Sequence, residues 1–257
     1  QSPQTKYLKD YLTPAYLVDQ VDLDFYLSPT ATRVTSTLTL RLNPDRNGVI
    51  EPLVLDGEHL QLLSVEMEGL PLTPDDYQCD DVGLTIAAPS AQFSLHIVTS
   101  IDPLNNTALE GLYQSNGIFC TQCEPEGFRK ITYYPDRPDV LAPFRVRIEG
   151  EPSDCPVLLS NGNLVEQGML DNGRHFACWE DPFPKPSYLF ALVAGNLACL
   201  EDHFITMSGR RVLLQIYVEQ RNRNDCDFAM ESLKKAMKWE EQVYGLEYDL
   251  DRYMIVA

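Results

Sequence analysis

The sequence predicts a mainly β protein whose last part changes to α/β. Two observations carry this prediction. From about residue 16 to residue 195, short runs of alternating apolar and polar residues recur with turn clusters between them, which is typical of a β-sandwich or a curved, saddle-like antiparallel sheet. After residue 195, one alternating run is followed by a stretch with apolar side chains at helical spacing. We therefore divide the chain into residues 1–195 and residues 196–257.

The first predicted elements form an antiparallel hairpin. Residues 21–27 alternate between apolar and polar, residues 28–31 supply a turn, and residues 37–42 alternate again. One face of this hairpin should be buried. Further strands are predicted at residues 60–67, 93–98, 146–148, 157–159, 176–179 and 188–193, with turns at residues 74–76 and 160–163.

The second part is predicted to contain a strand and then an amphipathic helix. The strand covers residues 212–218, and the helix covers residues 225–244. Asn224 or Asp225 is expected to cap the start of the helix, and Gly245 is expected to end it. An apolar run at residues 252–257 then reaches the end of the sequence, where exposed polar residues are usual, and this favours a chain that continues in the intact protein.

Charge and composition exclude several classes of partner. The net charge is -18, so nucleic acid and anionic membranes would be repelled. No apolar run approaches the roughly 20 residues of a membrane-spanning helix. Seven scattered cysteines favour reduced thiols and a cytoplasmic protein. Cys120 and Cys123 form a C-x-x-C, which we interpret as incidental thiols, with a redox pair or half a zinc site as alternatives.

Charged and polar side chains are densest between residues 106 and 140. Gln122 and Glu124 lie two positions apart there, so they project to the same side if the backbone is extended. A carboxylate and an amide oxygen that face one point can bind an ammonium group by charge-assisted hydrogen bonds. By residue type alone, such a pair is more often a solvated surface.

The neighbouring charged residues are predicted to be structural. Asp136 and Arg137 stand between prolines and suggest a rigid turn with a local ion pair, and Arg129 is a plausible partner for Glu110. Glu126 belongs to the same group, because ionic networks beside a cleft are common without being catalytic. Four aromatic residues are expected in the core: Tyr133, Tyr134, Trp179 and Trp239. For the two tyrosines, the alternative is that they line a pocket for a substrate side chain.

Several motifs of this chain together point to one family. They are Thr121-Gln122-Cys123-Glu124, Gly127-Phe128-Arg129 and Tyr134-Pro135-Asp136-Arg137-Pro138, with further matches at residues 159–163, 181–186, 188–195 and 245–251. They closely resemble the N-terminal domain of the bacterial aminopeptidase N family of zinc metallopeptidases. The resemblance covers nearly the whole chain and is specific.

The resemblance implies an activity and a role for two residues. The complete enzyme would remove N-terminal residues from peptides with a zinc-activated water. Glu124 would bind the amino terminus of the peptide substrate, with Gln122 beside it. Residues 196–257 would begin a thermolysin-like catalytic domain and would need the remainder of that domain as their partner.

The zinc site of that family has no counterpart in this sequence. A His-Glu-x-x-His helix, its third glutamate ligand and the preceding Gly-Ala-Met-Glu-Asn loop are all missing. No two of the four histidines lie four positions apart, as a helical ligand pair requires. We therefore expect no catalytic residue and no metal ligand in this chain, zinc only in the complete enzyme, and no activity of the chain alone.

Two other functions stay open at this point. The first is a non-catalytic β-sandwich module that uses Glu124 and Tyr134 to hold an amine or a sugar. The second is a glycosidase with Glu124 and Glu126 as its carboxylate pair. The glycosidase is the weaker of the two, because residues two positions apart share one side of a substrate whereas that mechanism needs carboxylates on both sides of the bond.

Overall fold

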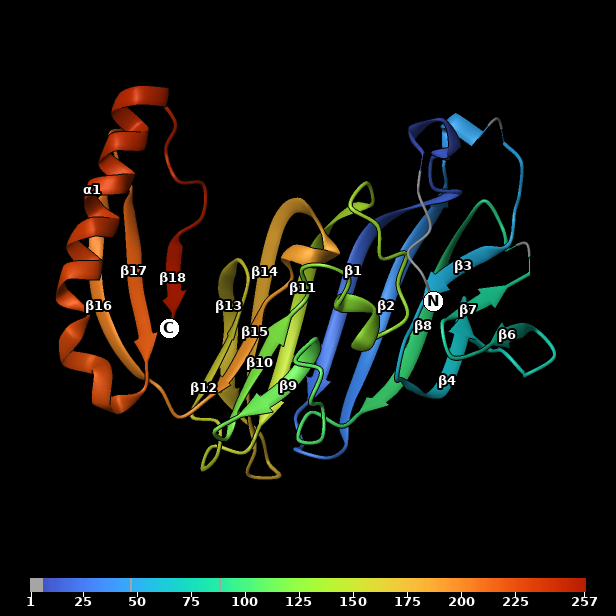
Figure 1. Ribbon diagram of the computed structural model, residues 1–257, viewed down its shortest axis with the longest axis horizontal. Helices are drawn as coiled ribbons and strands as arrows, with labels where there is room; N and C mark the ends of the chain where they lie inside the picture. The colour runs from blue at the N-terminus through green and yellow to red at the C-terminus, as the bar shows by residue number, and fades with distance from the viewer. Residues whose placement is uncertain (1–6, 47, 88) are drawn as a thin grey trace.

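The structure is a computed structural model that describes residues 7–46, 48–87 and 89–257. Within these ranges, eight strands form the largest sheet in the order β13-β14-β11-β1-β2-β8-β4-β5 (Figure 1). Only β1 and β11 of that order run parallel. The strands are β1 (Tyr16–Tyr26), β2 (Thr32–Leu42), β4 (Gln61–Met67), β5 (Leu70–Pro71), β8 (Gln92–Ile101), β11 (Leu141–Gly150), β13 (Asn163–Met169) and β14 (His175–Pro186).

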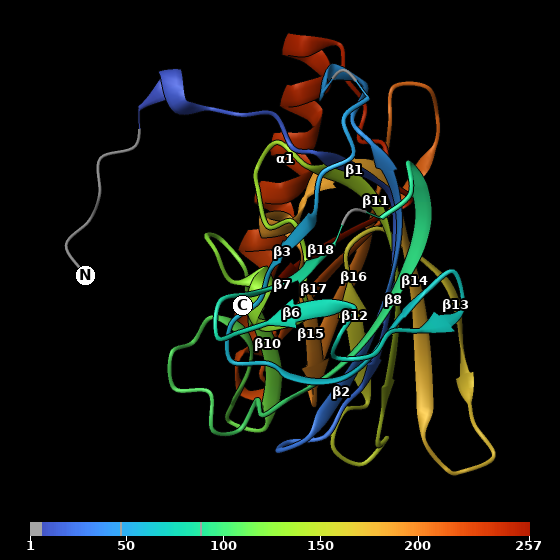
Figure 2. The same cartoon turned by 90° about the vertical axis from the view of Figure 1, so that its right-hand side faces the viewer.

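Two smaller sheets complete the β-rich part. One has the order β12-β15-β10-β9 and the other β3-β7-β6. A single hydrophobic cluster contains buried side chains from both of them and from the large sheet, so the layers share one core (Figure 2). Their strands are β3 (Leu53–Asp56), β6 (Tyr77–Cys79), β7 (Gly83–Ile86), β9 (Gly111–Ser115), β10 (Ile118–Gln122), β12 (Val157–Ser160) and β15 (Leu192–Gly195).

The predicted β-hairpin is confirmed as β1 and β2. Val21, Leu23 and Phe25 are at most 1% exposed, because every second side chain of β1 points into the core. Between the layers, the ring of Phe25 stacks on Phe190 and the indole N–H of Trp179 donates to the Leu158 carbonyl oxygen at 3.2 Å. These contacts confirm the sandwich arrangement and the core position of Trp179.

Residues 198–256 form a separate sheet with one helix against it, at the left of Figure 1. The apolar side chains of β17 and the buried Met230 and Met237 of the helix make a second hydrophobic cluster. The elements are β16 (Ala198–Ile205), β17 (Arg211–Val218), the 3₁₀ helix η5 (Gln220–Asp225), α1 (Asp227–Tyr244) and β18 (Arg252–Val256).

The end of α1 was predicted correctly and its start was not. Gly245 adopts a left-handed conformation with φ 66°, and its N–H donates to the Glu241 carbonyl oxygen at 3.0 Å. At the start, the expected caps Asn224 and Asp225 belong to η5, and the residue before the helix is Cys226. Its backbone is already near-helical, so no extended capping residue precedes α1 and no side-chain cap forms.

Two further predictions need correction. Trp239 was expected to pack in the core, but it is 51% exposed on α1 and touches the ring of Tyr244 edge-on. The strand predicted at residues 188–193 begins only at Leu192, because η4 (Ser187–Leu189) turns the chain first. The remaining 3₁₀ helices are η1 (Leu8–Asp10), η2 (Pro44–Arg46) and η3 (Phe128–Lys130).

The structure changes sheet near the predicted domain boundary. β15 ends at Gly195, and β16 begins at Ala198 in another sheet. The assignment of separate roles to residues 1–195 and 196–257 stays a prediction. Within the described ranges, no helix has both the length and the apolar character needed to cross a membrane.

Candidate functional site

The predicted site lies on the loop that joins β10 to η3. Gln122 ends β10, where it pairs with Gly111 of β9, and the chain then turns through residues 123–127. Gln122, Glu124 and Glu126 are exposed, whereas Cys123 is buried beneath them. We call residues 122–126 the loop tip.

Two glycines hold the backbone of this loop in place. The Gly127 N–H donates to the Cys123 carbonyl oxygen at 2.9 Å, and a Cβ on Gly127 would lie 2.2 Å from the Gln122 carbonyl oxygen. Gly111 has φ +72°, and a Cβ there would lie 2.8 Å from the Lys130 Cβ. Only glycine permits these close approaches, so the backbone below the loop tip has little freedom.

Gln122 and Glu124 are linked at the loop tip by one hydrogen bond. The Gln122 Nε2 donates to the Glu124 backbone oxygen at 2.8 Å. A carbonyl oxygen only accepts, so this contact fixes which end of the amide is nitrogen and leaves Oε1 as the acceptor. Among the side chains that the structure describes, none forms an ion pair or hydrogen bond with the Glu124 carboxylate.

Glu126 differs from Glu124 because its carboxylate is paired. Its Oε2 lies 3.1 Å from Nη1 of Arg129. Arg129 also binds Asp136, with 3.0 Å between Nε and Oδ2 and 3.1 Å between Nη2 and the Asp136 carbonyl oxygen. Asp136 is buried and accepts a hydrogen bond from the Ser187 hydroxyl at 2.5 Å.

Two predicted ion pairs in this segment are wrong. Glu110 pairs with Lys130 instead of Arg129, and the hydrogen bond from Lys130 lowers the pKa of the Glu110 carboxyl. Arg137 pairs with Asp139 at 2.7 Å instead of with Asp136. The reason is the same in both cases. The Asp136 carboxylate turns inward and engages Arg129, so Lys130 and Arg137 pair with acidic residues nearer the surface.

Tyr133 and Tyr134 belong to the core, as one of the two interpretations expected. They are 2% and 0% exposed, and burial raises the pKa of both phenols. Phe128, at the base of the loop, packs edge-on against Tyr134 with 5.0 Å between the ring centroids. Tyr134 is thus out of reach of a ligand bound at Glu124, which removes the residue pair on which the binding-module hypothesis relied.

The described residues offer no ligand set for a metal ion. Within residues 7–46, 48–87 and 89–257, no three His, Cys, Asp or Glu side chains lie close enough together to hold one. These residues therefore do not fit a zinc site, and we derive no chemical step through zinc here. All seven cysteines are free thiols, and burial raises the pKa of both Cys120 and Cys123.

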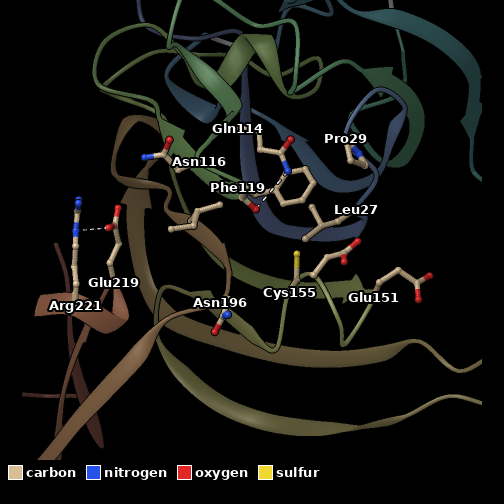
Figure 3. A pocket seen from close by; sticks show the side chains of 13 residues that line it. Leu27, Pro29, Gln114, Asn116, Phe119, Glu151, Cys155, Asn196, Glu219 and Arg221 are labelled. Carbon is tan, nitrogen blue, oxygen red and sulfur yellow. Dashed lines mark hydrogen bonds and ion pairs between the residues drawn. The ribbon is translucent and has the colours of Figure 1, made fainter. Parts of the chain in front are cut away.

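A cavity of about 550 Å³ lies away from the loop tip, beside the β9–β10 turn and residues 151–155 (Figure 3). Three carboxylates line it: Glu219 pairs with Arg221 at 2.8 Å and Glu151 pairs with Arg174 at 2.6 Å, whereas Asp154 accepts a hydrogen bond from the Ser153 hydroxyl at 3.0 Å. The sulfur of Cys155 points into the cavity, and burial raises its pKa to about 11. We assign no chemistry to these lining groups.

The chain matches one family over most of its length. The peptidase M1 N-terminal domain matches residues 18–189. Aminopeptidase N of Caulobacter vibrioides is 53% identical over all of this chain and 29% of its own length.

Two solved structures have a similar fold. Aminopeptidase A of Legionella pneumophila in complex with aspartic acid has a TM-score of 0.92 and 39% identity over 98% of this chain and 30% of that one. An M1 zinc metallopeptidase of Deinococcus radiodurans bound to a Tyr-Ser-Ala substrate has a TM-score of 0.78 at 16% identity, over 94% of this chain and 56% of that one, and this likeness concerns the fold alone. The chain thus spans less than a third of the length of the two more similar proteins.

Proposed function

This chain belongs to the peptidase M1 family, and we propose that it is the N-terminal part of a zinc-dependent aminopeptidase in which it holds the amino terminus of the peptide substrate. The observation that carries the proposal is the exposed Glu124 carboxylate at the loop tip, beside Gln122, with which no side chain in the described part of the chain forms an ion pair or hydrogen bond. Hydrolysis itself, with zinc and its activated water, is assigned to the part of the longer relatives that this chain does not cover.

The chemistry of the loop tip suits a primary ammonium group. An ammonium carries three N–H donors and needs acceptors only. The Glu124 carboxylate supplies charge and two acceptor oxygens, and Gln122 supplies the Oε1 that its own hydrogen bond leaves free. A peptide bound this way has its first peptide bond at a fixed distance from the anchor, so cleavage would stop after one residue.

The experiment that tests this function substitutes the two residues in the complete protein. We expect Glu124→Ala to lower kcat/KM by about 30-fold or more, because losing one partner of a desolvated charge pair costs about 2 to 5 kcal/mol and about 1.36 kcal/mol is tenfold in rate. Gln122→Ala should cost less, since a neutral hydrogen bond contributes about 0.5 to 1.5 kcal/mol. Bound zinc should be unchanged in both variants. Wild-type activity of Glu124→Ala on free peptides would remove Glu124 from the site.

The cellular setting and the isolated chain follow from the same proposal. Seven free thiols support a reducing compartment such as the cytoplasm. The isolated chain is expected to hydrolyse no aminoacyl anilide and to retain no stoichiometric zinc after dialysis. One tightly held zinc per chain would contradict this assignment.

A non-catalytic amine-binding module is the second candidate, favoured by the same exposed Glu124 carboxylate. It predicts that the complete protein binds peptides without cleaving them. The glycosidase reading has lost support, because Arg129 already compensates Glu126.

A further inference from the structure

We propose that the ion pair between Glu126 and Arg129 is a clamp that positions the Glu124 carboxylate for the ammonium group of the substrate. This inference rests on the proposed function. Glu126 would be a positioning residue, since it acts through Glu124 and makes no contact with the peptide. The clamp would explain why only one of the two carboxylates in this loop, that of Glu124 and not that of Glu126, binds the amino terminus of the substrate.

The guanidinium of Arg129 is held from the protein core. Its Nε and its backbone N–H both donate to Asp136 Oδ2, at 3.0 and 3.2 Å, and Nη2 donates to the Asp136 carbonyl oxygen. Asp136 is held in turn by the Ser187 hydroxyl, and its own N–H donates to Asp56 Oδ2 at 3.0 Å. An arginine that forms several hydrogen bonds to one buried residue has little conformational freedom, so the position of its remaining nitrogen is fixed.

That remaining nitrogen, Nη1, faces the loop tip. The Glu126 carboxylate lies 3.1 Å from it, whereas Asp56 and Glu58 lie 3.8 and 3.9 Å away. Glu126 is therefore its nearest acidic partner. Asp56 is a weaker rival because its carboxylate lies farther from Nη1 and already accepts the hydrogen bond from the Asp136 N–H.

The clamp restrains Glu124 from one side, and Gln122 restrains it from the other. Glu126 follows Glu124 by two residues in the same turn, which the hydrogen bond from Gly127 to Cys123 closes. On the other side, the Gln122 amide holds the Glu124 backbone oxygen. Without Glu126, the turn would lose one restraint, and the Arg129 charge would be free to attract Glu124 and compete with the substrate.

The chain contains a matched control for this ion pair. Lys130 follows Arg129 directly and pairs with Glu110, which is 50% exposed compared with 56% for Glu126. Glu126→Gln and Glu110→Gln each remove one exposed, paired carboxylate. Only Glu126 lies in the loop that carries Glu124.

The test measures kcat/KM of the complete protein on an aminoacyl anilide. Glu126→Gln should lower kcat/KM about three- to fivefold, as expected for loss of a well-placed ion pair, and Glu110→Gln should lower it less than about twofold. Both changes are at exposed positions, so melting temperatures should stay within about 2 °C of wild type. Equal effects of the two variants on kcat/KM would overturn the clamp.

A double-mutant cycle shows whether Glu126 acts through Glu124. In a Glu124→Gln background, Glu126→Gln should cause no further loss, because nothing remains to be positioned. The same fold loss in both backgrounds would mean that Glu126 acts independently, and the clamp alone would fail. If Glu124→Gln itself leaves kcat/KM unchanged, the proposed function fails and the clamp fails with it.

Discussion

The charged groups on the inner and outer sides of residues 122–137 differ in whether they are paired with other side chains. On the inner side, Asp136 binds both Arg129 and Ser187, and all three side chains are largely shielded from solvent. On the outer side, Glu124 keeps a carboxylate that no described side chain pairs with. One dense run of charges can therefore contain both groups that hold the fold and a group whose charge stays unengaged by the described side chains.

The inner network should give the largest effect on stability. Asp136→Ala leaves the Arg129 guanidinium without its main partner in a site where Asp136 is only 3% exposed, so we expect a loss of about 3 to 5 kcal/mol in the free energy of unfolding. Urea denaturation of the chain measures it. Asp139→Ala is the control, since it breaks the partly exposed pair with Arg137 and should cost about 1 kcal/mol. Similar losses in the two variants would contradict the distinction between inner and outer groups.

The glycine beneath the loop should give an intermediate effect. Gly127→Ala puts a Cβ against the Gln122 carbonyl oxygen, and relieving such a clash costs about 1 to 3 kcal/mol. Gly168→Ala is a suitable comparison, because its Cβ would meet only the Phe176 ring, at 3.3 Å, and should cost less than about 1 kcal/mol. A Gly127→Ala chain as stable to urea as wild type would show that the loop can shift freely.

The partly exposed ion pair between Arg137 and Asp139 should give the smallest effect, and that effect depends on pH. The hydrogen bond from Arg137 holds the pKa of Asp139 below its usual value. The stabilisation is therefore fully present above the ordinary aspartate pKa of about 4 and is lost as the pH falls through the lower folded value. Urea unfolding of wild type and Asp139→Asn should differ by less than about 1 kcal/mol at pH 6, and the difference should shrink toward pH 3. A difference that grows on acidification would contradict the assignment.

Much of the fold could be predicted from the sequence, because its signals are local. The alternation in β1 and β2 and the glycine that ends α1 act within a few residues, and the structure confirms both. Short strands such as β3 and β9 were not predicted, since four or five residues show little periodicity. The exposure of Trp239 was not predicted either, because helical spacing does not show which part of the apolar face of a helix the sheet covers.

The candidate site divides in the same way. Gln122 and Glu124 were chosen from residue types and a family motif, and their role stays a prediction. The partner of Arg129 could not be inferred from the sequence, because several acidic residues lie within reach along the chain. The choice depends on Asp136 turning into the core toward Ser187, which only the packing of distant strands decides.

The role proposed for Glu124 is to bind the free amino group of the substrate. The most direct test uses two ligands, a peptide and its analogue in which hydrogen replaces the α-amino group. The binding of each is measured to the complete protein with and without Glu124→Gln, after catalysis has been inactivated in both proteins. Calorimetry should show that Glu124→Gln weakens binding of the peptide by about 30-fold or more and leaves binding of the analogue nearly unchanged. An equal loss of affinity for both ligands would show that Glu124 does not recognise the amino group.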